Sequence, residues 1–308
     1  MGKLAAGSRT SRAYHTDSVD ALGETYRAAP VNYVQIAPGR LGADIHSVST
    51  TLVEVREVSF ETGVLLTIEN PFPRFALGIG LRGQSQLFGS HLTNSNIAYA
   101  DGHNGIIARV QGASSWCNIS IDPELLEQVA ATHHYVIPGG DASHGLPIEA
   151  QSALVSTISR VARSQHFVEL TDAQFDDEIA LTVLRVLNPS QNKGSTRLPQ
   201  HYIIVQRIVE YIHTHFSERM VVTGLCQLAG VSERKLQYTF LEATGLTVRQ
   251  YLMSYRLHRA HALLAGGKIA QVKDAAQACG IPHTGRFSQY FKSMFGDSPG
   301  QLLSQDNT

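Results

Sequence analysis

The sequence predicts an α+β protein with two domains, an N-terminal antiparallel β-sandwich or barrel with flanking helices and a C-terminal domain made only of helices. Three observations support this prediction. The chain of 308 residues is longer than one ordinary domain. Short β-rich segments fill residues 31–121, whereas apolar residues recur at helical spacing through 199–304. Residues 188–198, which are rich in Pro, Ser, Asn and Gly, have the composition of a linker between the two.

The N-terminal region contains an arm, a β-rich part and two helices. Residues 1–30 are small and polar without a period, so we expect a frayed, flexible arm there that contains at most a short helix. The β-rich segments are short and are separated by Gly, Pro and Asn, as in an antiparallel sheet; they are 51–60, 63–68, 75–81, 105–110 and 115–121. Helical spacing then predicts helices over 147–163 and 172–187, the second capped by Asp172. We expect residues 31–187 to form one domain.

Charge is distributed unevenly along the chain. The whole chain has 25 Lys and Arg against 26 Asp and Glu. Residues 197–308 hold 12 basic and 7 acidic residues, whereas residues 1–196 hold 13 and 19. Only the C-terminal part therefore carries the sign of charge that attracts phosphate.

The cysteines and the apolar runs exclude several protein classes. Cys117, Cys226 and Cys279 are widely separated and form no CxxC pair, so neither a disulfide framework nor a zinc ribbon is indicated. No apolar run approaches the roughly 18 residues that span a bilayer, and the opening segment lacks the apolar core of a signal peptide. We expect a soluble, cytoplasmic protein that does not contact a membrane.

One pattern occurs twice in the helical region, at about 221–245 and 272–296. With one extra residue in the second turn, the equivalent pairs are Gly230 and Gly280, Leu236 and Phe287, Phe240 and Phe291, and Gly245 and Gly296. In a helix-turn-helix unit the glycine supplies a positive φ at the turn, and apolar residues four apart anchor the second helix. A long helix over 248–265 is predicted to connect the two units and to end at Gly266.

The outward residues of each second helix are donors and acceptors of the kind that read base edges in a major groove. The candidates for base contacts are Arg234, Gln237, Tyr238, Thr284, Arg286 and Gln289. The candidates for phosphate contacts are Ser232, Lys235, Arg249, Lys273, Ser288 and Lys292. Ser232 is also expected to cap its helix. A solvated charged face is the alternative for the lysines and for Arg249.

The second unit resembles a known family segment. Residues 279–299, CGIPHTGRFSQYFKSMFGDSP, resemble the signature of AraC/XylS regulators, roughly CGF followed by FSRxFKxxFGxSP. Residues 229–237 and 251–260 resemble the first recognition helix and the connecting helix of the family. The resemblance covers about 199–304 and implies seven helices, with two recognition helices that enter successive major-groove segments of double-stranded DNA. No enzymatic activity is implied.

The sequence departs from the family pattern at positions that face the DNA. Tyr238 and Gln289 stand where Arg is common, and Ile281 replaces the usual Phe. The substitutes keep apolar size or outward polarity, so the fold is expected to be unchanged. The base sequence that is read should differ, since Gln suits adenine and Arg suits guanine.

For the N-terminal part the resemblance implies a cupin-like domain that binds an effector and dimerises. The expected partners are thus a small-molecule effector, RNA polymerase and a second copy of the chain. His46, Arg82 and Trp116 are candidates to line an effector pocket, although a core aromatic and two surface polar residues are the alternative. The helices over 147–163 and 172–187 either form the dimer interface or pack only on their own sheet.

An enzyme is the main competing interpretation. A metal-binding cupin would need converging ligands such as HxH, but His46, His91 and His103 stand alone. A DNA-repair methyltransferase with this helical domain would need clustered thiolates, whereas the cysteines are scattered. We expect no catalytic residue, no metal and no other cofactor. An effector-independent regulator, whose N-terminal domain only dimerises or binds a protein, remains an alternative.

Overall fold

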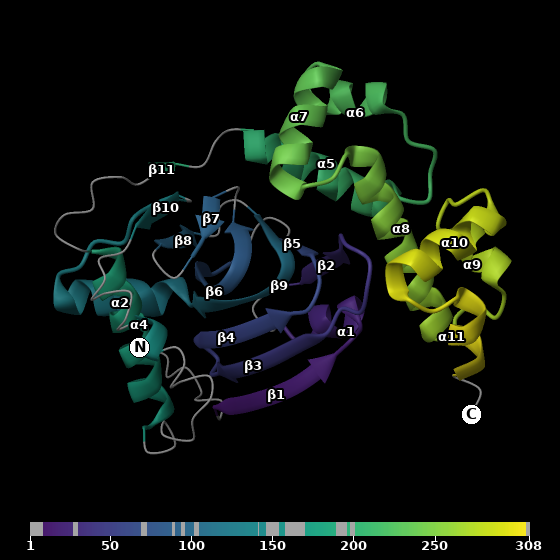
Figure 1. Ribbon diagram of the computed structural model, residues 1–308. Coiled ribbons are helices and arrows are strands. Elements are labelled where there is room, and N and C mark those ends of the chain that lie inside the picture. Colours follow the sequence, from purple (N-terminus) through teal and green to yellow (C-terminus); the bar gives the residue numbers. More distant parts are fainter. Residues whose placement is uncertain are drawn as a thin grey trace.

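The structure is a computed structural model. It describes residues 9–26, 30–68, 73–87, 90–93, 96–101, 105–140, 142–145, 154–157, 170–188, 196–197 and 201–305. In this part of the chain an antiparallel half-barrel is followed by a helical domain, joined by contacts along one side (Figure 1). The predicted fold class is confirmed.

The half-barrel is one continuous antiparallel sheet. Its strands are β1 (Thr10–Thr16), β2 (Val31–Gln35), β3 (Ala43–Ser49), β4 (Val53–Phe60), β5 (Val64–Ile68), β6 (Phe75–Leu87), β7 (Ser90–Leu92), β8 (Asn96–Ala100), β9 (Ile106–Ile121), β10 (Ala142–Gly145) and β11 (Thr196–Arg197). The main path runs β1-β3-β4-β9-β6-β8-β10-β11, and β5 joins β2 to β9.

Two long strands bend the sheet into a half-barrel. The first half of β9 pairs with β5 and its second half pairs with β4, while β6 follows β9 along most of its length. The β6–β9 register shifts between Gly80 and Gln84. Gly83 and Gly112, at φ +75° and +59°, lie at the bend, where a residue with a Cβ would be strained.

The two faces of the sheet are buried differently. One face packs on α2 (Pro123–His133) and α4 (Asp172–Leu187), and includes Leu77 and Ile119. The other face, which includes Val58 and Trp116, belongs to a hydrophobic cluster that continues into the C-terminal domain. Side chains alternate between the two faces along each strand, and because both faces are covered, β4 is buried along most of its length, including Glu54, Arg56 and Glu57.

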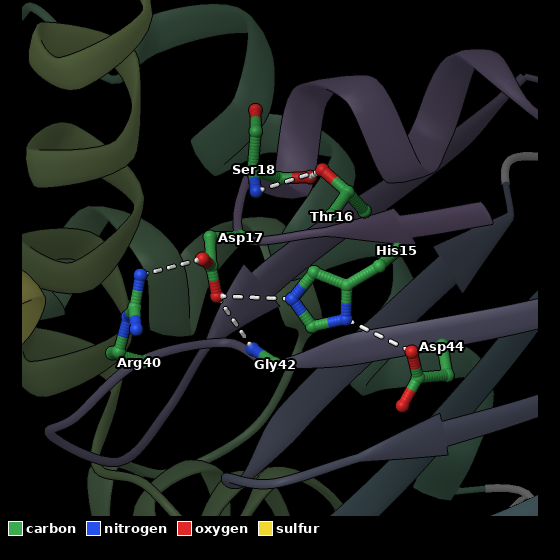
Figure 2. A network of polar contacts seen from close by, with 7 residues as sticks. All are labelled: His15, Thr16, Asp17, Ser18, Arg40, Gly42 and Asp44. Carbon is green, nitrogen blue, oxygen red and sulfur yellow. Dashed lines mark hydrogen bonds and ion pairs between the residues drawn. The ribbon is translucent and has the colours of Figure 1, made fainter.

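Residues 10–24, which are part of the predicted arm, form a strand and a short helix instead of a frayed segment. β1 pairs with β3, and the short helix α1 (Val19–Glu24) buries Val19 and Leu22. Figure 2 shows how the turn between them is tied down: Asp17 accepts hydrogen bonds from Arg40 Nη2 and from the Gly42 amide, each at 3.1 Å. An edge strand takes its partners from elsewhere in the chain, so its polar local sequence carried no signal.

His15 extends this network on the exposed side of β1. Its Nδ1 lies 2.9 Å from Asp44 Oδ1, and this hydrogen bond raises the pKa of His15 (Figure 2). Further along, the Arg9 amide donates to Asp172 Oδ2 at 3.1 Å. The N-terminal segment is thus attached both to β3 and to α4.

α4 is present as predicted, but its N-cap lies one residue before the predicted Asp172. Thr171 caps the helix and accepts from Gln174 N, and Gln174 Oε1 accepts in return from Thr171 N. Asp172 is instead the first helical residue. Phe175 and Val183 of this helix are buried against its own sheet, which supports the packing alternative over the dimer interface.

Two predicted segments lie mostly outside the described residues. Of the helix over 147–163 the structure describes 154–157, and of the linker over 188–198 it describes Asn188 and β11. The boundaries of the domains on either side of that linker stay predictions.

The C-terminal domain is helical throughout its described length. Its helices are α5 (His201–His215), α6 (Val222–Ala229), α7 (Glu233–Thr244), α8 (Val248–Ala265), α9 (Val272–Ala278), α10 (Thr284–Phe295) and α11 (Pro299–Gln305). The connecting helix has the bounds that the sequence predicts, and Gly266 is its C-cap. In Figure 1, α8 runs from the α5–α7 group to the α9–α11 group.

The two domains contact each other through buried polar and apolar groups. The Gln35 amide at the end of β2 donates to His258 Nε2 of α8 at 2.9 Å, and both residues are buried. Gln35 Nε2 also donates to the Met294 carbonyl near the end of α10 at 3.1 Å. Burial lowers the pKa of His258 to about 3, so the neutral ring is the acceptor in this bond.

Candidate DNA-binding surface

The first repeated unit has the turn that its sequence predicts. α6 ends at Gly230, which has φ 66° and ψ 32°, the left-handed conformation that glycine adopts freely. The Val231 amide then donates to the Cys226 carbonyl at 3.1 Å and closes the turn. The Ser232 side chain accepts from Lys235 N at 3.4 Å, so Ser232 caps α7 as expected.

The second unit repeats this turn with one difference. Gly280 has φ 69°, and the Ile281 amide donates to the Ala276 carbonyl at 2.9 Å, the bond equivalent to that of Val231. α10 starts one residue later than the repeat would place it, and His283 at its N-cap makes no side-chain cap bond. The extra residue therefore lengthens the turn without changing how it closes.

One side of each second helix is buried in a core. Leu236 and Phe240 of α7, and Phe287 and Phe291 of α10, are almost fully buried, as the four-residue spacing predicts. The first pair lies in the cluster that continues into the half-barrel, and the second pair lies in a separate cluster with α8 and α9. The two reading helices are thus anchored in different cores.

The opposite side of α7 is exposed and polar. Arg234, Lys235 and Tyr238 are exposed, with 69% of Tyr238 accessible, and Gln237 is half-buried. On α10, Arg286 and Gln289 are exposed and Ser288 is half-buried. Thr284 starts α10, but its side chain lies outside the described residues.

The remaining phosphate candidates flank these helices. Arg249 lies in the first turn of α8, Lys273 in the first turn of α9 and Lys292 in the last turn of α10, and all three are exposed. Ser232 is also exposed, although its side chain is already a helix cap. All twelve DNA-contact assignments stay predictions.

One exposed residue of this domain was missed from the sequence, and one basic residue has an internal role. Tyr290, 44% exposed, adds an aromatic ring beside Gln289 on α10. The repeat gave no signal for it, because the equivalent Thr239 is buried. Arg256 donates from Nε to the Phe216 carbonyl and from Nη2 to the Glu218 carbonyl, at 2.6 and 2.7 Å, and so ties α8 to the end of α5.

A buried polar pair also fixes α5 against α8. His213 Nε2 lies 2.7 Å from Tyr251 Oη, and the His213 ring stacks on Tyr255 with centroids 4.2 Å apart. Burial lowers the pKa of His213 to about 4, so the ring is neutral at physiological pH. The pair holds the first unit at a fixed position on the connecting helix.

The three effector candidates do not converge. In the strand pairing His46 stands opposite Glu57, while Trp116 stands opposite Val58, so their side chains point to opposite faces of the sheet. Arg82 lies at the bulged end of β6, where its Nε donates to Ser115 Oγ at 3.4 Å. Of the three only Trp116 is on the inner face, and it is 6% exposed.

The inner face instead contains a charged residue that the sequence did not single out. Arg56 of β4 is completely buried, opposite Ser47 and Asn118. Its Nη2 donates to Thr25 Oγ1 at 2.7 Å, and the guanidinium lies 5.4 Å from the centre of the Tyr26 ring. Among the described residues its Nε and Nη1 have no hydrogen-bond partner. Since residues two apart on a strand share a face, the sequence of β4 was sufficient to predict that Arg56 lies on the same face as Val58.

Two further statements, on metal ligands and on membrane-spanning helices, concern the described residues only. No three His, Cys, Asp or Glu side chains in this part of the chain lie close enough together to hold a metal ion. Its helices are also too short or too polar to cross a membrane.

Comparison with known proteins identifies the helical domain. A family model described as a helix-turn-helix domain matches residues 225–305. The HTH-type transcriptional activator RhaR of Klebsiella pneumoniae is 30% identical over 142 residues, 46% of this chain and 48% of that protein. The probable thc operon regulatory protein of Rhodococcus erythropolis is 33% identical over 102 residues, 32% of this chain and 31% of that protein.

A solved structure matches over the same region. A probable AraC family transcriptional regulator from Rhodopseudomonas palustris is 29% identical and covers 33% of this chain and 96% of its own, with a TM-score of 0.32. The matches to RhaR and to the thc regulator span about half or less of the length of those relatives. Residues 225–305 therefore form a helix-turn-helix domain that is similar to those of AraC/XylS transcriptional regulators.

Proposed function

We propose that the chain is a sequence-specific regulator that places α7 and α10 in two successive major-groove segments of double-stranded DNA. The observation that carries the proposal is the matched pair of helices, each anchored by two buried apolar residues and exposing donors on its other side. The connecting helix α8 joins the two units in one body. The base contacts would come from Arg234, Gln237, Tyr238, Thr284, Arg286 and Gln289.

The salt dependence of binding tests this proposal. Four of the phosphate candidates are charged: Lys235, Arg249, Lys273 and Lys292. If all four neutralise phosphates, the affinity of the full chain for its promoter should fall about 100-fold between roughly 50 and 200 mM salt. Fluorescence anisotropy with promoter DNA measures the slope. Binding that does not change with salt would contradict the proposed surface.

The same proposal includes an effector site in the half-barrel, supported by Arg56. A buried guanidinium with two unpartnered nitrogen atoms is costly, because desolvation is not offset by hydrogen bonds. A ligand carboxylate or phosphate would supply the missing acceptors, since a guanidinium binds such groups through several N–H donors. An acidic effector is thus favoured over a neutral one. The effector-independent alternative predicts no binding to this face.

A conservative pair of variants tests the role of Arg56. Arg56→Lys keeps the charge but loses the planar fork of N–H donors that binds a carboxylate through two hydrogen bonds, so it should weaken the response to an acidic effector about tenfold or more. Thermal shift of the full chain with a panel of organic acids measures the response. Arg82→Lys is the matched control, because Arg82 already donates to Ser115. An equal loss in both variants would contradict the assignment.

Further partners follow from the regulatory role. We propose that the chain works in the cytoplasm as a homodimer and contacts RNA polymerase at its promoter. The DNA-binding assignment does not depend on either partner, because each subunit carries both helix-turn-helix units.

A further inference from the structure

A cavity lies where the two domains meet. It has a volume of about 290 Å³, near the lower end of the range for small-molecule pockets. One side comes from α1 and β2 of the half-barrel and the other from α8. The lining includes Val19, Asp20, Glu24, Val31, Tyr255 and Arg259.

The lining combines an apolar interior with charges of both signs. Val19, Val31 and Tyr255 are buried, whereas Glu24 and Arg259 are exposed and Asp20 is half-buried. Asp20 and Glu24 are four residues apart on α1, so their carboxylates lie on one side of that helix. Arg259 faces them from the other domain. The cavity therefore presents two anionic groups from one domain and a cation from the other.

These charges are not satisfied by each other. Within the described chain neither carboxylate forms an ion pair with Arg259. Burial raises the pKa of Asp20, and the positive charge of Arg259 offsets this only in part. The Arg259 guanidinium instead lies 5.7 Å from the centre of the Phe216 ring. Both signs of charge thus remain available to a ligand placed between them.

We propose that this cavity binds a small zwitterion, a molecule that carries an ammonium and a carboxylate on a short apolar frame, such as an α-amino acid. The ammonium would meet Asp20 and Glu24, the carboxylate would meet Arg259, and the apolar part would contact Val19, Val31 and Tyr255. A cation alone would leave Arg259 without an anionic partner. An anion alone would meet two carboxylates of its own sign.

A ligand in this position would link the domains. His258 lines the cavity and accepts the Gln35 amide hydrogen bond that joins β2 to α8. A ligand that contacts both domains makes its full set of contacts only while the domains are docked. Its binding free energy therefore stabilises the docked arrangement and shifts the population toward it. Neither Arg56 nor any of the candidates for DNA contact lines this cavity.

Calorimetric titration of the full chain with individual L-amino acids tests the proposal. At least one should bind, and Asp20→Asn and Arg259→Gln should each weaken its binding about tenfold or more. Asp177→Asn and Arg219→Gln make the same changes at exposed positions outside the cavity and should leave the affinity unchanged. Absence of binding by every amino acid at millimolar concentration, or equal binding by all four variants, would overturn the proposal.

Two further measurements test the class of ligand and the link between the domains. Two analogues of the bound amino acid, one that lacks the carboxylate and one that lacks the amine, should each bind at least tenfold more weakly than the amino acid itself. Equal binding of either analogue overturns the zwitterion assignment. Hydrogen exchange at residues 31–35 should slow when the amino acid is bound, because the Gln35 amide is held by His258. Unchanged exchange with the site occupied overturns the link.

Discussion

Phe240→Ala is expected to destabilise both domains, by about 3 to 5 kcal/mol, whereas Phe287→Ala should destabilise only the second helix-turn-helix unit by a similar amount. Both rings are fully buried, so each substitution leaves a large cavity. They differ in what surrounds them, since Phe240 lies in the cluster that also contains Trp116 of the half-barrel, and Phe287 lies in a separate cluster.

The single tryptophan makes this difference measurable. Trp116 fluorescence reports unfolding of the half-barrel, and circular dichroism reports loss of helix. In urea, Phe240→Ala should move the Trp116 transition to lower concentration. Phe287→Ala should lower only the urea midpoint of the transition seen by circular dichroism. That transition should then separate from the one reported by Trp116 fluorescence. Equal movement of the Trp116 transition in both variants would show that the clusters are not energetically separate.

Removing the two exposed arginines of the reading helices should have the second largest effect. Arg234→Ala and Arg286→Ala are each expected to cost about 1 to 3 kcal/mol in specific binding, and the effects should add because the residues lie in separate units. Both side chains are exposed, so folding should be unaffected.

Electrophoretic mobility shift with operator DNA and with a scrambled duplex separates specific from general binding. The arginine variants should lose affinity for the operator and keep most of their affinity for the scrambled duplex. Lys292→Ala provides the contrast, since a phosphate contact should weaken binding to both duplexes equally. If both arginine variants keep operator affinity, α7 and α10 read DNA through a different face.

Local features of the sequence were sufficient to predict the helical domain. The turn glycine at 230 and the apolar pair at 236 and 240 act within a few residues of each other, and the structure has them as predicted. The bounds of α8 follow for the same reason, because a capping residue and a C-terminal glycine are local signals. Tyr290 was missed because its equivalent in the first unit, Thr239, was not among the outward candidates.

The sequence by itself determined the fold class, the two helix-turn-helix units and the side of each reading helix that is buried. Only the tertiary structure decided that His46 and Trp116 face opposite ways, that Arg56 is buried without enough partners, and that Gln35 and His258 join the domains. The physical reason is distance along the chain. Helix caps and turns depend on neighbouring residues, whereas strand register, buried charge and domain docking depend on partners far away in sequence.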